Sequence, residues 1–343
     1  MKNKERIFIT GGMGYIGSVF AVESLRRGHD ICLYDSLMYE QDRLQMIKEI
    51  SAHKSKKSEL KFVIGDTRNK ELLRQSLEDF KPTYVLHFGE LSSVYACNHN
   101  PLFTEDINYF GSKQVLDVCE TLNLKVLYNS SSSVYGTQKE SRLMKENDSL
   151  PEPTDYYCRY KIKMEQFIKA KTVKNPKFKI IVFRPATVFG ISPRFRIELL
   201  PNHFTYMAIS RKLIKISDLN AYRAAIDIEE LVNGYFKVID KGNWNNLIYN
   251  IGHYNMSKKE FADGIQGVVN CKIGNAPDIG DLRNLQIDCS LFNNEFDFKP
   301  TTSFKKSIEK IAKWIGKNLE DIENNNFVGL LNMPLDKWRQ ICS

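Results

Sequence analysis

Tyr157 and Lys161 carry side chains that could exchange a proton with a substrate hydroxyl. They lie four residues apart, a spacing that places both on the same face of a helix. A phenol is a weak base at neutral pH because its ordinary pKa is about 10. A neighbouring ammonium favours the phenolate and lowers that pKa. The pair is therefore a candidate general acid and base, although the same spacing also arises by chance.

A run of serines, Ser130 to Ser133, directly follows the apolar stretch 125–128. A hydroxyl at the end of a strand in this place can bind the oxygen whose proton Tyr157 removes. Serines in a loop also hydrogen-bond to their own backbone, and this run fits that interpretation as well. The catalytic interpretation depends on the other motifs that accompany the run.

A glycine-rich turn joins the apolar run 7–9 to a helix-like pattern at 19–25. Glycines let the backbone approach a pyrophosphate, and free N–H groups at a helix start face it. The candidates for cofactor binding in the turn are Gly11, Gly14, Tyr15, Ile16 and Gly17. Asp35 follows 18 residues after Gly17, where a carboxylate accepts the ribose hydroxyls of NAD and repels the 2′-phosphate of NADP. A plain tight turn and an ordinary strand-end aspartate are the alternative.

Strand and helix patterns alternate through the first half of the chain. This alternation predicts an α/β fold with a doubly wound parallel sheet, the Rossmann arrangement, and ligands then bind outside the carboxyl ends of the strands. The expected strands are 7–9, 31–34, 60–64, 84–88, 125–128 and 178–183, and the expected helices are 19–25, 70–80, 103–122 and 156–171.

The alternation stops after residue 184, where loops lengthen and glycine, asparagine and proline become frequent. We therefore expect a nucleotide-binding domain over 1–184 and a smaller mixed substrate-binding lobe over 185–343. Part of 225–245 is expected to return to the first domain. Helices are expected at 231–239 and 303–317, and 324–343 has no assignment.

The composition indicates a globular protein of 343 residues with a net charge of +8. No apolar run approaches the roughly 18–20 residues of a membrane span, and the N-terminus shows no signal-peptide pattern. The seven scattered cysteines predict reduced thiols and a cytoplasmic protein, and no spacing predicts a metal site. Without a basic stripe interleaved with aromatic residues, nucleic acid is not an expected partner, whereas a mild positive charge suits a phosphate-bearing substrate.

Taken together, these motifs resemble the extended short-chain dehydrogenase/reductase family, in particular its nucleotide-sugar epimerases, dehydratases and decarboxylases. The resemblance covers about 5–315 and rests on the glycine turn, Asp35, Gly65-Asp66, His87-Phe88, Asn108 with Gly111, the serine run, Tyr157 with Lys161, and Asp281-x-Arg283. It implies tightly held NAD, with Asp35 on the adenosine ribose, Asp66 near the adenine, and Lys161 on the nicotinamide ribose. Phe88 and Gly89 are further cofactor-binding candidates.

The resemblance places the family's catalytic hydroxyl on Ser131, counted back from Val134-Tyr135-Gly136. The adjacent Ser132 is the alternative position for this hydroxyl and is a candidate for substrate binding. Similar dehydratases carry Asp-Glu directly after the catalytic hydroxyl, where this chain has Ser132 and Ser133. Neither serine can act as a carboxylic acid, which argues against 4,6-dehydration.

Glu90 and Ser92 depart from the pattern of the galactose epimerases, which usually carry a small residue and a lysine at these positions. Glu90 could bind a sugar hydroxyl or act as a second acid or base, because carboxylates in such clefts are often functional. It could also simply anchor a loop.

The stretch 183–196 resembles a branch that contains GDP-heptose 4-dehydrogenases of capsule synthesis and related sugar epimerases. Arginine forks bind phosphate oxygens in pairs, so several arginines are candidates for the substrate diphosphate or base, whereas Arg184 is expected to support the strand end. Asn202 is a candidate for the nucleotide pocket, and the adjacent His203 is expected to be a packed residue. The arginine candidates are Arg194, Arg196, Arg223 and Arg283.

The leading hypothesis is an NAD-dependent epimerase of a nucleotide-linked sugar. Tyr157 removes the proton of the C4 hydroxyl, Ser131 holds the C4 oxygen, and NAD accepts the hydride from C4. The hydride is then returned to the other face of the keto sugar. A 4-dehydrogenase that releases the keto sugar shares the first half of this reaction. A non-catalytic, NAD-bound sensor or scaffold is the third hypothesis. The resemblance also implies a homodimer through the helices 103–122 and 156–171, and leaves the nucleotide and sugar open.

Overall fold

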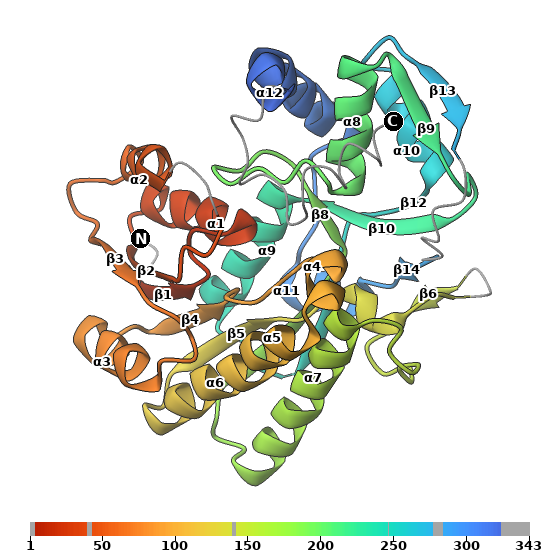
Figure 1. Cartoon of the computed structure of the whole chain (residues 1–343). Helices are drawn as coiled ribbons and strands as arrows, with labels where there is room; N and C mark the ends of the chain where they lie inside the picture. Colours follow the sequence, from red (N-terminus) through yellow and green to blue (C-terminus); the bar gives the residue numbers. More distant parts are fainter. Residues whose placement is uncertain (1–3, 40–42, 139–141, 246, 277–283, 324–343) are drawn as a thin grey trace.

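Most strands of one large parallel sheet come from the first half of the chain (Figure 1). The structure is a computed structural model that describes residues 4–39, 43–138, 142–245, 247–276 and 284–323. In spatial order the strands are β11 (Ile248–Ile251), β7 (Ile180–Pro185), β5 (Lys125–Asn129), β4 (Tyr84–His87), β1 (Arg6–Thr10), β2 (Asp30–Asp35) and β3 (Leu60–Ile64). All neighbouring strands run parallel, so the predicted doubly wound α/β fold is confirmed.

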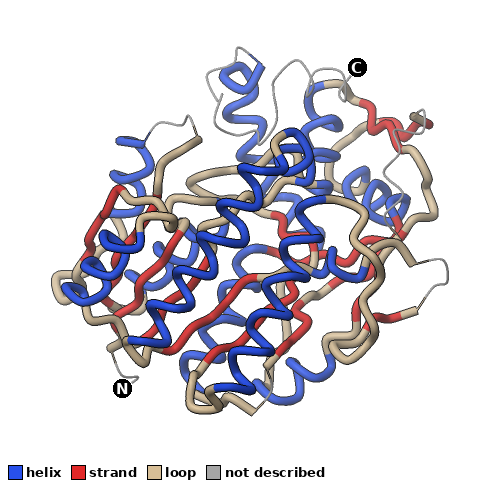
Figure 2. Tube along the Cα trace, turned by 60° about the horizontal axis from the view of Figure 1, so that its bottom comes forward, coloured by secondary structure: helices blue, strands red, loops and turns tan. Residues whose placement is uncertain are grey.

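Alternating side chains of the strands build a core on each face of the sheet. Ile7 and Ile9 of β1 pack with one cluster of buried residues and Phe8 packs with another, as the twofold period of a strand requires. Figure 2 shows helices packed over the sheet and running roughly along its strands. The first face is covered by α1 (Tyr15–Arg26), α2 (Arg43–Ser51), α9 (Ile228–Lys241) and α11 (Ser290–Phe296), and the second by α3 (Lys70–Phe80), α6 (Ser112–Thr121) and α7 (Tyr156–Lys174).

The helix expected over 103–122 contains an irregular turn. It consists of α5 (Pro101–Glu105), the π-helical segment η1 (Asp106–Gly111) and α6. The wide turn of η1 contains the fully buried Asn108. Its amide donates to the carbonyl oxygen of Leu91 and accepts from the Leu91 N–H, both at 2.8 Å. The loop that follows β4, with α4 (Val94–His99) after it, is thereby fixed to the helix.

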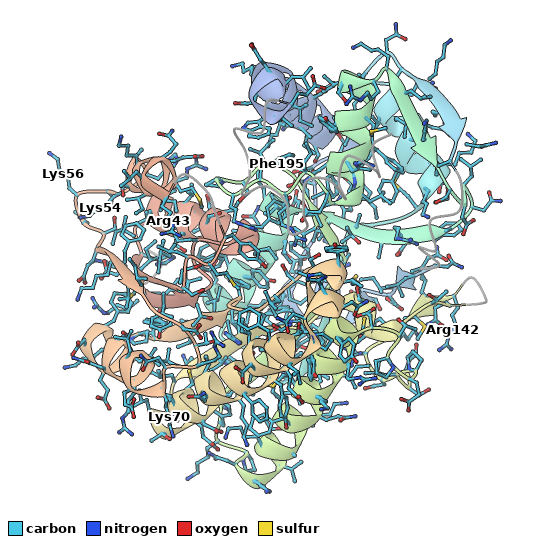
Figure 3. The ribbon with its side chains drawn as sticks, viewed as in Figure 1. Arg43, Lys54, Lys56, Lys70, Arg142 and Phe195 are labelled. Atoms are coloured by element: carbon cyan, nitrogen blue, oxygen red, sulfur yellow. The ribbon has the colours of Figure 1, made fainter. Side chains whose placement is uncertain are left out.

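The chain leaves the sheet after β7 and returns to it with α9 and β11. Between and after these elements it forms a second lobe with its own buried cluster. Phe195 belongs to that cluster, with its ring centroid 4.4 Å from that of Trp314 (Figure 3). The remaining elements are η2 (Ser132–Tyr135), β6 (Leu143–Met144), β8 (Thr187–Phe189), α8 (Leu200–Ser210), β9 (Leu213–Ile216), β10 (Tyr222–Asp227), β12 (Tyr254–Ser257), α10 (Lys258–Gln266), β13 (Lys272–Asn275), β14 (Gln286–Ile287) and α12 (Phe304–Glu323).

Arg184 supports the end of β7 from inside the protein. Its guanidinium donates to both carboxylate oxygens of Glu165, at 3.0 and 2.6 Å, and both side chains are at most 2% exposed. Because removal of one partner leaves a buried charge unpaired, Arg184→Met should lower the free energy of unfolding by about 3–5 kcal/mol. Urea denaturation measures this change. Arg74→Met breaks the exposed Arg74–Glu78 pair and should cost at most about 1 kcal/mol; equal losses in the two variants would contradict the prediction.

Candidate active site

A cavity of about 410 Å³ lies at the carboxyl ends of the parallel strands, within the range of about 300–1,000 Å³ that is typical of ligand pockets. Strand ends bring side chains to this edge in a parallel sheet. Its lining includes residues that end or follow β2, β4, β5 and β7, namely Asp35, Phe88, Asn129 and Pro185. The second lobe contributes the loop that carries Arg194 and Arg196.

The glycine turn forms one wall of the cavity through Gly11, Gly14, Tyr15, Ile16 and Gly17. Gly11 has a φ of +65°, and a Cβ there would lie 2.6 Å from the carbonyl carbon of Phe88. Gly14 is the N-cap of α1 and supplies no side-chain cap, so N–H groups of the first helical turn remain available to an anion. A backbone cradle that admits no side chain fits a dinucleotide pyrophosphate.

Asp35 and Asp66 mark the end of the cavity beside β2 and β3. The carboxylate of Asp35 accepts the N–H groups of Met13 and Leu37, at 2.9 and 2.8 Å. Each carboxylate oxygen retains further acceptor capacity, which fits the two hydroxyls of a ribose. Arg68 donates hydrogen bonds to the carboxylate of Asp66 and thereby lowers the pKa of Asp66. Phe88 and Gly89 also line the cavity.

Tyr157, Ser131 and Lys161 meet at the other end of the cavity. Asp155 caps α7 by accepting the Cys158 N–H at 2.8 Å, and the helix turns Tyr157 and Lys161 toward its buried side. Ser131 lies close enough to Tyr157 for its side chain to act against the rise in the pKa of the phenol that burial causes, and both residues line the cavity. The sequence-predicted proton-transfer group, its hydroxyl partner and the ammonium are therefore neighbours in the folded chain.

Lys161 is paired with a carboxylate inside the cavity wall. Its ammonium lies 5.8 Å from the ring centroid of Tyr157, donates to the carbonyl oxygen of Asn129, and forms an ion pair with Glu90. Burial raises the pKa of Tyr157 well above its ordinary value, and the Glu90 carboxylate adds to this effect. The expected lowering of the Tyr157 pKa therefore does not appear, because burial and the counter-charge of Glu90 outweigh the ammonium.

The arginine candidates have different positions. Arg194 lines the cavity with its guanidinium 4.2 Å from the ring centroid of Tyr39. Burial raises the pKa of Asp35, and the charge of Arg194 acts against that rise. Arg196 also lines the cavity and donates to Ser92 at 3.1 Å. Arg223 is buried on β10, donates to the carbonyl oxygen of Tyr222, and is not part of the cavity lining. Arg283 and Asp281 lie outside the described residues.

Two other substrate-binding candidates are also absent from the lining. Asn202 is fully buried, accepts the Gly190 N–H, and donates to Tyr15 and to the carbonyl oxygen of Arg196. These bonds favour a structural role. Ser132 begins the short helix η2 and is 5% exposed, whereas Ser131 and Ser133 beside it line the cavity. The substrate roles of Asn202 and Ser132 remain predictions without support from the geometry.

Sequence reasoning missed Tyr39, Asn129 and Glu198 in the cavity lining. Asn129 ends β5 directly before the serine run, a position that could have identified it. Glu198 accepts from Arg196 at 2.8 Å, and an acidic residue two positions after an arginine is only a weak signal. Tyr39 reaches the cavity from the loop after β2, and no sequence pattern marks it.

Among the helices in the described ranges, none combines the length and apolar character needed to cross a membrane. Within the same ranges, no group of three or more His, Cys, Asp or Glu side chains is arranged to hold a metal ion.

The family model and the related proteins that match this chain all point to the same family. The model of the NAD dependent epimerase/dehydratase family matches residues 7–252. The UDP-glucose 4-epimerase of Erwinia amylovora is 24% identical over 338 residues, which cover 91% of this chain and 98% of that protein. The UDP-glucose 4-epimerase of Klebsiella pneumoniae is 32% identical over 134 residues, which cover 39% of this chain and 94% of that one.

Solved structures share the fold at lower identity. The UDP-glucose 4-epimerase of Bifidobacterium longum, in complex with NAD+ and UDP, has a TM-score of 0.80 at 22% identity and covers 92% of this chain and 99% of that one. The dTDP-glucose 4,6-dehydratase of Bacillus anthracis, in complex with NAD, has a TM-score of 0.77 at 22% identity and covers 92% and 98% of the two chains.

Proposed function

The chain belongs to the NAD-dependent epimerase/dehydratase family, and we propose that it is a nucleotide-sugar epimerase that works through a 4-keto sugar. The observation that carries the proposal is that Tyr157, Ser131 and Lys161 line the same cavity as the glycine turn. An acid–base phenol, a hydroxyl that fixes the reacting oxygen, and a dinucleotide cradle thus share one site. Curated relatives named UDP-glucose 4-epimerase support the same reaction.

In the proposed reaction, Tyr157, Ser131 and Lys161 each have a separate role. Tyr157 removes the proton of the C4 hydroxyl and returns it, while Ser131 holds the C4 oxygen by a hydrogen bond. Lys161 keeps its ammonium beside the phenol and faces the cavity, where a nicotinamide ribose hydroxyl would lie. The positioned phenol is a general acid and base of the kind that contributes about 10²–10⁴-fold to a rate.

NAD supplies the hydride acceptor and donor at C4 when it is bound. The glycine turn, the first turn of α1 and Asp35 would hold its pyrophosphate and adenosine ribose. Asp35 disfavours a 2′-phosphate at the same place. Arg196, which lines the cavity, is the candidate for the substrate diphosphate, whereas Arg194 beside Asp35 has the better position for the cofactor. Arg223 and Arg283 remain candidates for the substrate.

The second hypothesis is a 4-dehydrogenase that releases the keto sugar, since it needs the same residues. Dehydration is disfavoured because Ser132 and Ser133 supply no carboxylic acid next to Ser131. A non-catalytic role is disfavoured because Tyr157, Ser131 and Lys161 meet in one cavity.

Incubation of the purified protein with UDP-, GDP-, CDP- and dTDP-linked hexoses and heptoses tests the proposal. NMR and mass spectrometry should find one of these sugars converted into an isomer of equal mass until the two reach a constant ratio. A released sugar that is lighter by the mass of a hydrogen molecule would favour the 4-dehydrogenase. Absence of any conversion by a protein that holds NAD would favour the non-catalytic hypothesis.

We further propose that the protein is a cytoplasmic homodimer. The free cysteines of the described chain suit a reducing compartment. Exposed apolar side chains lie on the neighbouring segments α5, η1 and α7, with Leu102 80%, Phe110 48% and Val173 80% exposed. Symmetric dimers are the commonest oligomers. Sedimentation should give twice the chain mass of 39.7 kDa; the monomer mass would contradict the dimer.

A further inference from the structure

Glu90 places a buried carboxylate against the ammonium of the active site. Its side chain is 4% exposed, and its two carboxylate oxygens have different partners. One accepts the hydroxyl of Ser112 at 2.8 Å, and the other forms the ion pair with Lys161. We propose that Glu90 is the counter-ion of Lys161 and a positioning residue that sets the pH at which Tyr157 becomes a base. The inference rests on the proposed role of Tyr157.

A chain of buried hydrogen bonds holds Glu90 in this place. Ser112 is itself bonded to the His87 ring at 2.8 Å, and the other nitrogen of that ring lies 2.6 Å from the hydroxyl of Thr10. Burial lowers the pKa of His87 to about 4, so the ring is neutral at physiological pH. The next residue, Leu91, is fastened to Asn108 through both of its backbone groups. The carboxylate is therefore fixed from several directions.

Two charges of opposite sign lie in the cavity wall beside Tyr157. The Lys161 ammonium favours the phenolate, whereas the Glu90 carboxylate, on the loop after β4, disfavours it. The other titratable groups that act on Tyr157 or Glu90 come from each neighbouring element: Cys158 on α7, Cys97 on α4, Tyr128 on β5, His87 on β4 and Tyr235 on α9. Burial raises the pKa of Cys97, Tyr128 and Tyr235, so these groups remain uncharged at neutral pH. Lys161 and Glu90 are therefore the charged pair that we consider.

The contacts of Glu90 differ from those expected of a residue that binds the substrate. Its oxygens point to Ser112 and Lys161, both of which belong to the protein. Lys161 keeps a second partner, the carbonyl oxygen of Asn129, so loss of the carboxylate charge should leave the ammonium in place. Without the opposing charge, that ammonium should favour the Tyr157 phenolate at a lower pH.

Glu90→Gln tests the inference because it removes the charge and preserves the shape of the side chain. The ¹³Cζ resonance of labelled Tyr157, assigned by its loss in Tyr157→Phe, should reach its phenolate position about one pH unit or more below that of the unaltered protein. The acidic limb of kcat/KM should move in the same direction. The resonance needs no substrate, so the inference can be tested even if the proposed sugar reaction fails.

Two variants serve as controls. Glu105→Gln removes a carboxylate of α5 that pairs with Lys163 of α7 at 3.3 Å, outside the cavity, and should leave the Tyr157 titration unchanged. Glu90→Asp keeps the charge and should restore most of the unaltered pH profile. If Glu90→Gln does not fold, Glu90→Ser removes the same charge, leaves room for water beside Lys161, and must give the same shift.

Two outcomes would overturn the inference. One is a folded Glu90→Gln protein whose Tyr157 titration and acidic limb stay where they were. The other is a rise in KM with an unchanged pH profile, which would identify Glu90 as a ligand of the sugar.

Discussion

Tyr157→Phe is expected to lower kcat by about 10²–10⁴-fold, the contribution of a positioned general acid and base, while the content of bound NAD stays the same. The substitution removes only the hydroxyl that meets Ser131. The ring is 9% exposed and packs in a small apolar cluster with Leu91 and Cys97, contacts that phenylalanine preserves. Steady-state assays and quantification of the cofactor released on denaturation measure the two effects.

Tyr160→Phe is the matched control for this variant. It makes the same change on the same helix at a residue that is 4% exposed and does not line the cavity. Its kcat should equal that of the unaltered protein. If Tyr157→Phe turned over substrate as fast as Tyr160→Phe, Tyr157 would not be the acid–base group.

Gly17→Ala should weaken NAD binding by about 5- to 150-fold. An added Cβ would lie 2.3 Å from the carbonyl oxygen of Gly11, a distance that forces the glycine turn to move. Overpacking of this kind costs about 1–3 kcal/mol, and each 1.4 kcal/mol is about tenfold in affinity. Calorimetric titration of the cofactor-free protein with NAD measures the loss, and thermal unfolding shows whether the variant remains folded.

Gly316→Ala adds the same methyl group on α12, where nothing lies within 4 Å of the new atom. NAD affinity should not change, and the free energy of unfolding should rise by about 0.5–1 kcal/mol, because Gly316 is exposed on its helix and alanine restricts the unfolded chain. Equal NAD affinity in the two variants would show that the turn tolerates a side chain and does not contact the pyrophosphate closely.

The fold was predictable because its determinants are local and periodic. Buried strands, the glycine turn and Asp35 are close in sequence, and the alternation of strands with helices dictates which strand ends share an edge. Tyr157 and Lys161 were predictable for the same reason, since one helical turn relates them. Their roles, and that of Ser131, remain predictions that the common cavity supports.

Features that depend on distant segments were not predictable. Glu90 and Lys161 are far apart in the chain. Glu90 follows β4 and Lys161 lies on α7, and they meet only because the folded chain packs α7 against the segments that follow β4. Asn202 is a polar residue after a proline, and nothing in that pattern tells a ligand contact from an internal bond to Gly190 and Tyr15. Arg194 lies near Asp35 because Phe195, beside it, packs into the second lobe.

The irregular turn η1 makes the active site sensitive to deletions in a helical segment that does not itself contain the catalytic residues. A π-helical turn winds more residues into each turn than an α-helix does. Deleting a residue within Asp106–Gly111 would let this segment wind as a regular α-helix, so the residues of the wide turn could not keep their present directions. Asn108 would then lose Leu91, and the adjacent carboxylate would lose its anchor. A deletion in this helical segment should therefore alter proton transfer by Tyr157 although no residue of the catalytic cavity has been substituted.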